Sequence, residues 1–155
     1  MDELTRFTIA ADRMVAALNA GGATPETAAA FGDEVELLRY GWGQASDHVV
    51  EHLHGREALS KWLARSPATA RFERRGDAIP LGDGSARQHY GLEMDGFRNG
   101  GRWRIRLDAD GRVCWWEHRP GDLDPDIQTP EWRARVEHAL DVDPTLRPIE
   151  TDGDP

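Results

Sequence analysis

The sequence contains only one cysteine, Cys114, among 155 residues. One thiol cannot form a disulfide within the chain, and a thiolate-rich metal site requires several cysteines, so both features are excluded. The first residues are acidic and amphipathic and lack the basic and apolar regions of a signal peptide. We therefore expect a cytoplasmic protein in a reducing compartment.

Long hydrophobic runs and a basic surface are also missing. No apolar run approaches the roughly 20 residues of a membrane-spanning helix. Hydrophobic residues make up 39% of the chain, which is enough for the core of one soluble domain. Lys and Arg number 19 against 28 Asp and Glu, giving a net charge of -9. Phosphate binding needs a dominant basic surface, so we expect no nucleic-acid partner, and without an apolar run of membrane length we expect no membrane partner.

The first half of the chain predicts helices followed by strands. Apolar residues recur at helical spacing until Gly21-Gly22, and Thr24-Pro25-Glu26 is a typical helix start. A third helix begins at residue 55 and ends at Ser66-Pro67. The predicted elements are helices at 3–20, 24–31 and 55–66, strands at 34–40 and 71–79, and a loop at 41–54.

Residues 86–119 predict three antiparallel strands joined by two tight turns. Asp95-Gly96 is a strong hairpin signal that places Met94 opposite Phe97 and, further along, Gln88 opposite Trp103. This register predicts one buried face and one solvent face. The buried face carries Ala86, Gln88, Tyr90, Leu92, Met94, Phe97, Asn99, Gly101, Trp103, Ile105 and Leu107, and the solvent face carries Arg87, His89, Glu93, Arg98, Arg102, Arg104 and Arg106.

The composition changes after Pro120, where ten acidic residues accompany three arginines. Thr129-Pro130-Glu131 predicts the start of a short helix ending near Leu140, and the last dozen residues are expected to be disordered. We therefore predict one domain over residues 1–120 and an acidic extension over 121–155. The extension, or a symmetry mate, could cover the stripe formed by Arg102, Arg104 and Arg106.

Three segments together resemble the nuclear-transport-factor-2-like superfamily over about residues 5–120. They are FGDEVELL from Phe31, HGREALSKWL from His54 and RIRLDADGRVCWWEHR from Arg104. The resemblance implies an α+β fold, a cone-shaped mixed or antiparallel sheet curved around N-terminal helices, as in a cystatin-like roll. The superfamily includes ketosteroid isomerases, SnoaL-like polyketide cyclases, limonene epoxide hydrolases, scytalone dehydratases and non-enzymatic binders. One fold hosting so many chemistries does not itself specify an activity.

The catalytic groups of two of these families are missing. In ketosteroid isomerases a helix tyrosine, an aspartate base and a protonated acid work together, and the resemblance puts Met14, Arg39 and Trp103 at those positions. Met14 and Trp103 are expected to contact substrate there without supplying that chemistry. In limonene epoxide hydrolases an acid lies on the last strand, where this chain has His118, and no Arg-x-Asp occurs in residues 84–95.

His118 is the main candidate for proton transfer. By alternation it shares a face with Cys114 and Trp116, which the resemblance turns inward. A histidine there could be a general acid or base near neutral pH. The alternative is a histidine at the mouth of the cone that bonds to a backbone group.

Tyr90, Gln88 and Asn99 place polar groups on the buried face of the hairpin. They could orient a carbonyl or hydroxyl group of a substrate, or form a network that satisfies itself within the core. Trp42, Trp62, Trp103 and Trp116 could line an aromatic pocket for a planar or polycyclic ligand, or fill the core.

The segment 41–54 contains Asp47-His48, which could be a base and its orienting partner or part of a solvated loop. His48 and His52 have one-face helical spacing, but no HExxH pattern completes a metal site, and we expect neither a metal nor a cofactor.

The leading hypothesis is a SnoaL-like lyase, isomerase or cyclase without cofactor, acting on an apolar oxygenated small molecule. His118 would be the acid or base, helped by Asp47 or His48, with Tyr90 orienting the substrate. The second hypothesis is a non-catalytic member that binds a hydrophobic ligand or a protein. Relatives commonly pair through the outer sheet face, so a homodimer is also expected.

Overall fold

Three helices and six strands form the part of the chain that the structure describes. The computed structural model describes residues 1–41, 48–65, 69–94 and 97–121. The helices are α1 (Glu3–Ala20), α2 (Pro25–Ala30) and α3 (Arg56–Leu63), and the strands are β1 (Phe31–Tyr40), β2 (Val49–His54), β3 (Arg71–Pro80), β4 (Ser85–Met94), β5 (Phe97–Leu107) and β6 (Val113–Pro120). No helix within these ranges is both long and apolar enough to cross a membrane.

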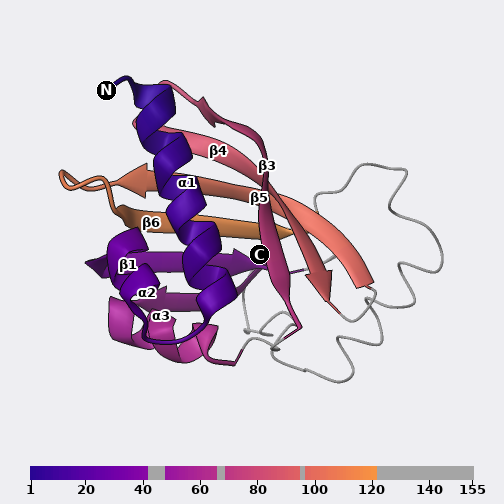
Figure 1. The fold of residues 1–155 in the computed structure, drawn as a ribbon. Helices are drawn as coiled ribbons and strands as arrows, with labels where there is room; N and C mark the ends of the chain where they lie inside the picture. Colours follow the sequence, from indigo (N-terminus) through magenta and orange to yellow (C-terminus); the bar gives the residue numbers. More distant parts are fainter. Residues whose placement is uncertain (42–47, 66–68, 95–96, 122–155) are drawn as a thin grey trace.

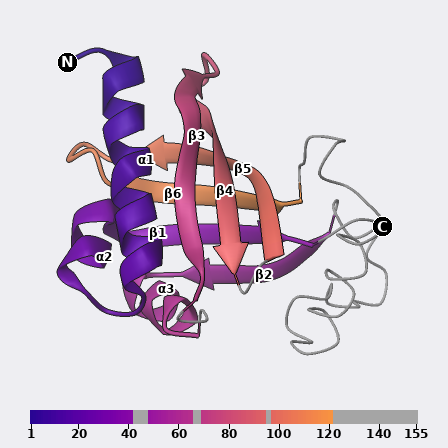
Figure 2. The same ribbon diagram turned by 45° about the vertical axis from the view of Figure 1, so that its right-hand side comes forward.

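The strands form one mixed sheet in the order β2-β1-β6-β5-β4-β3. Neighbouring strands are antiparallel except β1 and β6, which are parallel. The sheet is curved, and α1 lies across one of its faces beside β3 (Figures 1 and 2). The α+β prediction with a curved mixed sheet around N-terminal helices is therefore confirmed.

Local sequence signals fix the helix ends. The Asp2 carboxylate accepts a hydrogen bond from the Thr5 backbone N–H at 2.7 Å, and Gly21 ends α1 with φ 69°. A positive φ costs glycine little, so Gly21 suits this position. The Thr24 hydroxyl caps α2, with Pro25 in its first turn. Both helix starts agree with the sequence prediction.

The predicted register of the central hairpin is confirmed along its whole length. Met94 pairs with Phe97 and Gln88 with Trp103. Most described inward positions of β4 and β5 are fully buried, while Leu92 and Leu107 are half-buried and the arginines at outward positions retain exposure. The buried members are Ala86, Gln88, Tyr90, Asn99, Trp103 and Ile105. The concave face of the sheet is therefore the wall of the core.

The loop prediction for residues 41–54 is wrong in its second half. Val49–His54 forms β2, which pairs antiparallel with β1 and is an edge strand. Only Val50 is fully buried there, so the strand has little apolar alternation for the sequence to reveal. His52 therefore lies on an extended strand, where its Nε2 is 2.9 Å from a carboxylate oxygen of Glu36, and the helical spacing of His48 and His52 does not apply.

Cys114 does not share the inward face with Trp116 and His118. The register between β5 and β6 shifts so that Arg106 pairs with Trp115 and Leu107 with Val113. Cys114 is the extra residue of this bulge and is half-buried, and its Sγ lies 3.5 Å from the backbone oxygen of Arg106. The bulge puts Val113 on the buried side in its place.

Candidate functional site

The concave face of the sheet holds a cluster of aromatic rings from β4, β5 and β6. Tyr90 stacks on Trp103 with ring centroids 4.8 Å apart, and Trp116 stacks on His118 at 5.4 Å. Trp62 of α3 contacts Trp116 edge-on at 5.9 Å. Tyr90, Trp103 and Trp116 are at most 2% exposed. The rings pack against one another and give the inward face of the sheet an apolar, aromatic lining, of the kind that walls sites for apolar ligands.

A hydrogen bond between Tyr90 and His118 lies at the centre of this cluster. The Tyr90 hydroxyl oxygen is 2.6 Å from His118 Nε2. The two residues are on strands separated by β5, where Gly101 pairs with Tyr90 on one side and Pro120 on the other. Because Gly101 has no side chain, the Tyr90 ring can lie across β5 and reach His118. A Cβ at this position would be 2.6 Å from the Tyr90 hydroxyl oxygen.

Burial controls the charge of His118. Desolvation, with a further contribution from the Arg39 guanidinium, lowers the pKa of His118 to about 3. The imidazole is therefore neutral at physiological pH, which corrects the expectation that it titrates near neutrality. A neutral ring carries one proton, so when Nε2 accepts from the Tyr90 hydroxyl, Nδ1 is a donor.

Several inward polar atoms have no hydrogen-bond partner among the described residues. They are Gln88 Oε1, both amide atoms of Asn99, the indole nitrogens of Trp103 and Trp116, and His118 Nδ1. An unpaired buried polar atom costs about 1–3 kcal/mol, so such atoms are rare unless something binds them. Their concentration on one concave face makes this the candidate site.

Gln88 has a structural role as well as an unpaired oxygen. Its amide nitrogen lies 3.1, 3.0 and 2.9 Å from the backbone oxygens of Arg75, Gly76 and His89. Arg75 and Gly76 adjoin the irregular part of β3, where the pairing with β4 shifts and Gly76 has φ 70°. The amide therefore satisfies backbone groups that the sheet leaves unpaired, and only Oε1 remains for a ligand.

A buried ion pair beside the cluster is the feature that sequence reasoning missed. Arg39 is only 3% exposed and its guanidinium bonds to the Glu51 carboxylate of β2. The Trp62 indole N–H donates to the same carboxylate at 2.9 Å, and Arg65 donates at 2.9 Å. Arg39 is also the register partner of His118 on the neighbouring strand. The sequence pattern that could have predicted the burial of Arg39 is the alternation in β1, where Val35, Leu37 and Arg39 all face inward.

Glu51→Gln should destabilise the folded protein by about 2 kcal/mol, because it removes the carboxylate charge that bonds to the buried guanidinium of Arg39. Urea unfolding at neutral pH measures the change. Glu57→Gln is the matched control, since Glu57 forms an exposed pair with Lys61 and its loss should be almost neutral. Equal losses of unfolding free energy in the two variants would show that the Arg39–Glu51 pair stabilises the fold no more than an exposed ion pair does.

The other residues predicted for the site do not all lie in the aromatic cluster. Met14 is fully buried on α1, and Trp62 is half-buried against the aromatic cluster. Trp42 and Asp47 lie outside the described residues. His48 is half-buried, and its backbone oxygen accepts a hydrogen bond from the Gly41 N–H at 3.0 Å. In the described ranges no three His, Cys, Asp or Glu side chains gather as metal ligands would.

The site lies in one half of the sheet. Register places Tyr90, Asn99 and His118 near the end where β1, β4 and β6 finish and where β2 and β5 begin. The segments that connect these strand ends include 42–47 and 95–96, which are not among the described residues.

Comparison with known proteins bears on the fold. No family model matches the chain, and no curated protein matches it. A solved protein of unknown function from Exiguobacterium, described as nuclear-transport-factor-2-like, matches 74% of this chain and 99% of its own with TM-score 0.53 and 15% identity. The chain has the nuclear-transport-factor-2-like fold.

Two further structures with this fold carry functional descriptions. A proposed ketosteroid isomerase from Kribbella flavida matches 79% of this chain and 84% of its own, with TM-score 0.59 and 19% identity. An epoxide hydrolase from Mycobacterium tuberculosis, similar to limonene epoxide hydrolase, matches 91% and 98%, with TM-score 0.56 and 17% identity. At such identities the similarity extends to the nuclear-transport-factor-2-like fold alone, and the chemistry must come from the residues of the cone.

Proposed function

We propose that this protein binds an apolar, oxygenated small molecule in its cone and acts on it as a cofactor-independent lyase, isomerase or cyclase of the SnoaL-like type. The observation that carries the proposal is the buried Tyr90–His118 hydrogen bond, surrounded by aromatic rings and by polar atoms without partners in the described ranges. Ligand sites typically combine apolar walls with a few convergent polar groups.

The proposed ligand is flat and carries an oxygen. Trp103 and Trp116 lie edge to face with ring centroids 5.8 Å apart, and Trp62 contacts Trp116 at 5.9 Å. An aromatic or polycyclic ligand would bury its faces against these rings, while a carbonyl oxygen would accept hydrogen bonds from N–H groups that otherwise lack a partner. Isomerase and epoxide hydrolase descriptions among the structural neighbours are compatible with substrates of this kind.

His118 acts in this proposal as a neutral hydrogen-bond donor. The Tyr90 hydroxyl donates to Nε2 and thereby fixes the imidazole proton on Nδ1, which donates to the carbonyl oxygen of the ligand. When a base removes a proton from the carbon next to that carbonyl, negative charge develops on the oxygen. A fixed donor in a buried site stabilises this charge more than it stabilises the neutral carbonyl.

The base in this scheme is Asp47 or His48, as the sequence predicts. The proton that it takes from carbon is returned to a different carbon in an isomerisation. In a lyase reaction it leaves with a β-hydroxyl group as water.

Tyr90→Phe and His118→Gln should each reduce turnover by about 10- to 100-fold, because each removes or misorients the donor at the developing charge. The substrate would be found by screening steroid ketones, polycyclic quinones and terpene epoxides against the full chain. His52→Gln is the matched control, since His52 is an exposed histidine on β2 and its loss should leave turnover unchanged. Unchanged turnover in Tyr90→Phe and His118→Gln, both folded by circular dichroism, would overturn the assignment of the site.

A second candidate function is ligand binding without catalysis. The low pKa of His118 favours binding without catalysis. A histidine acts as a general acid in its protonated form, and at neutral pH the His118 imidazole is neutral. Glu51, the carboxylate next to the site, is already bonded to Arg39, Trp62 and Arg65. The same screen separates the two functions: tight binding that depends on Tyr90 and His118, with no product formed, would favour the binder.

A further inference from the structure

The side-chain amide of Asn99 on β5 is buried without a hydrogen bond in the described part of the chain. Asn99 is 1% exposed, and neither its Nδ2 nor its Oδ1 has a partner there. Gln88, the other buried amide on this face, bonds through its nitrogen to backbone oxygens. Two unpaired polar atoms in one buried side chain are costly, and the described residues provide nothing that offsets the cost.

The residues beside Asn99 in the sheet are apolar. Leu92 is its register partner on β4, and Phe72 is the partner of Leu92 on β3. Both side chains are half-buried against the core, and the Phe72 ring contacts the Tyr90 ring with centroids 5.9 Å apart. An apolar ligand that lies against these side chains meets the Asn99 amide at this end of the wall.

The amide determines the kind of polar group that it can bind fully. Nδ2 donates hydrogen bonds and Oδ1 accepts them, so a partner for both atoms has to accept one hydrogen bond and donate another. A hydroxyl group does both. A carbonyl or ether oxygen only accepts, and it would leave Oδ1 unpaired.

The register separates this amide from the proposed carbonyl site. Trp103 pairs with His118 on β6, and Asn99 precedes Trp103 by four residues on β5. Four residues of a strand span about 13 Å, and adjacent strands are about 4.8 Å apart, so the backbones of Asn99 and His118 are about 14 Å apart. The pair formed by Tyr90 and Gly101 lies between them in register. One ligand can bond to both side chains only if its two polar groups lie at opposite ends of the molecule.

We propose that Asn99 selects the substrate of the cone, and that this substrate is an elongated apolar molecule with a carbonyl oxygen at one end and a hydroxyl group at the other. The inference rests on the proposed function, which places the carbonyl oxygen at His118 Nδ1. The hydroxyl group donates to Asn99 Oδ1 and accepts from Nδ2, so both atoms gain a partner when the substrate binds. A hydroxyl group next to the carbonyl lies too far from Asn99 to do this.

Binding of matched ketones to the full chain tests the inference. The compounds share one rigid polycyclic ketone from the screen and differ only at the far end, which carries a hydroxyl group, a second carbonyl or hydrogen. The hydroxyl compound should bind about 10- to 100-fold more tightly than the hydrogen compound, with the second ketone between them. Asn99→Leu should reduce this preference to less than about 2-fold, because the amide that distinguishes the compounds is gone.

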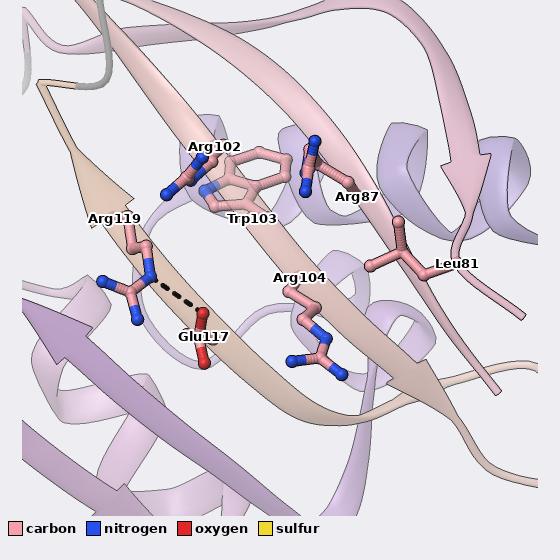
Figure 3. A pocket seen from close by; sticks show the side chains of 7 residues that line it. All are labelled: Leu81, Arg87, Arg102, Trp103, Arg104, Glu117 and Arg119. Carbon is pink, nitrogen blue, oxygen red and sulfur yellow. Dashed lines mark hydrogen bonds and ion pairs between the residues drawn. The ribbon is translucent and has the colours of Figure 1, made fainter. Parts of the chain in front are cut away.

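Arg87→Gln is the control for binding elsewhere on the sheet. Arg87 lies on the outer face of β4, on the side away from the helices (Figure 3). It lines a hollow of about 220 Å³ together with Arg102, Arg104 and Arg119. Guanidinium groups also donate hydrogen bonds to oxygenated compounds. Arg87→Gln should leave the hydroxyl preference unchanged, and loss of the preference in this variant would place the hydroxyl group in the outer hollow and overturn the inference.

Urea unfolding tests the role of Asn99 without a ligand. Asn99→Leu replaces the unpaired amide by an apolar group of similar size, so the unfolding midpoint should stay unchanged or rise. Gln88→Leu is the matched comparison, and its midpoint should fall because the backbone oxygens of Arg75, Gly76 and His89 lose a donor. An equal fall in Asn99→Leu would show that the amide serves the fold, and would overturn the inference.

The side-chain amide signals of Asn99 in nitrogen-15 NMR provide a check that needs no substitution. They should shift when the hydroxyl compound binds and stay in place with the hydrogen compound. Compounds whose binding requires His118 but ignores the far hydroxyl group would overturn this inference and leave the proposed function standing. Absence of any binding that depends on His118 across the screen would overturn the proposed function, and this inference with it.

Discussion

Acidification should destabilise the folded protein through His118 by about 4 kcal/mol between about pH 7 and pH 3. In the unfolded chain His118 takes up a proton near its ordinary pKa of 6.5, whereas in the folded protein its pKa is about 3. Between these values the unfolded state binds more protons. Stability is therefore complete above about pH 6.5 and is lost as pH falls, by about 1.4 kcal/mol per pH unit.

Urea unfolding of the full chain at a series of pH values measures this loss. Carboxylates also contribute in acid, since hydrogen bonds from Ser85 lower the pKa of Asp83 to about 2 and its stabilisation disappears as that group protonates. His118→Gln isolates the histidine, because the carboxylates are common to both proteins. The two stability curves should converge as pH falls from 6 to 4. Parallel curves across this range would mean that His118 is not held neutral by burial.

Gly101→Ala should destabilise the protein by about 3 kcal/mol at neutral pH, because there is no room for a methyl group at this position. A Cβ on Gly101 would overlap the backbone oxygen of Arg119 in the neighbouring strand and lie 2.6 Å from the Tyr90 hydroxyl oxygen. The backbone oxygen belongs to the sheet and cannot move without breaking its pairing. The Tyr90 ring would be pushed away from His118, so the central hydrogen bond should be lost as well.

Gly91→Ala is the matched control for Gly101→Ala. Gly91 lies on the adjacent strand, and the three atoms nearest to a Cβ there all belong to the guanidinium end of Arg75, a flexible group that can move aside. Its cost should be under about 1 kcal/mol. Equal losses of unfolding free energy in the two variants would show that the close approach of Tyr90 and of the Arg119 backbone to Gly101 does not require a glycine there.

The sequence predicted the parts of the fold that depend on local rules. The Asp95-Gly96 turn determined the register of β4 and β5, and alternation then assigned each residue to a face. Thr24-Pro25 marked the start of α2 because capping depends on residue type and position alone. From the same register it followed that Tyr90, Asn99 and Trp103 face inward.

Other features depend on neighbours that a single sequence does not reveal. β2 was missed because an edge strand with one fully buried residue has almost no apolar pattern. Cys114 was placed on the wrong face because a bulge breaks the alternation by one residue. The ion pair between Arg39 and Glu51 joins two strands, and neither residue alone indicated that it would be buried with a partner.

The sequence indicated which residues to consider for the site, but not the hydrogen bond between them or the protonation state of His118. His118 and Tyr90 were both expected in the cone, yet their hydrogen bond depends on the gap at Gly101 and the neutral state of His118 depends on complete burial. Burial is a property of the packed core, which residue type does not encode. The roles of Asp47 and Trp42 stay predictions because those residues lie outside the described ranges.

Nitrogen-15 NMR of the His118 imidazole, recorded near neutral pH with and without a ligand from the screen, tests the proposed site most directly. We expect a neutral ring with its proton on Nδ1, an Nε2 signal that shifts in Tyr90→Phe, and an Nδ1 signal that moves when ligand binds. A ring that is already partly protonated near pH 6.5, or an Nδ1 signal that a bound ligand leaves unchanged, would contradict the assignment of Tyr90 and His118 as the polar centre of the cone.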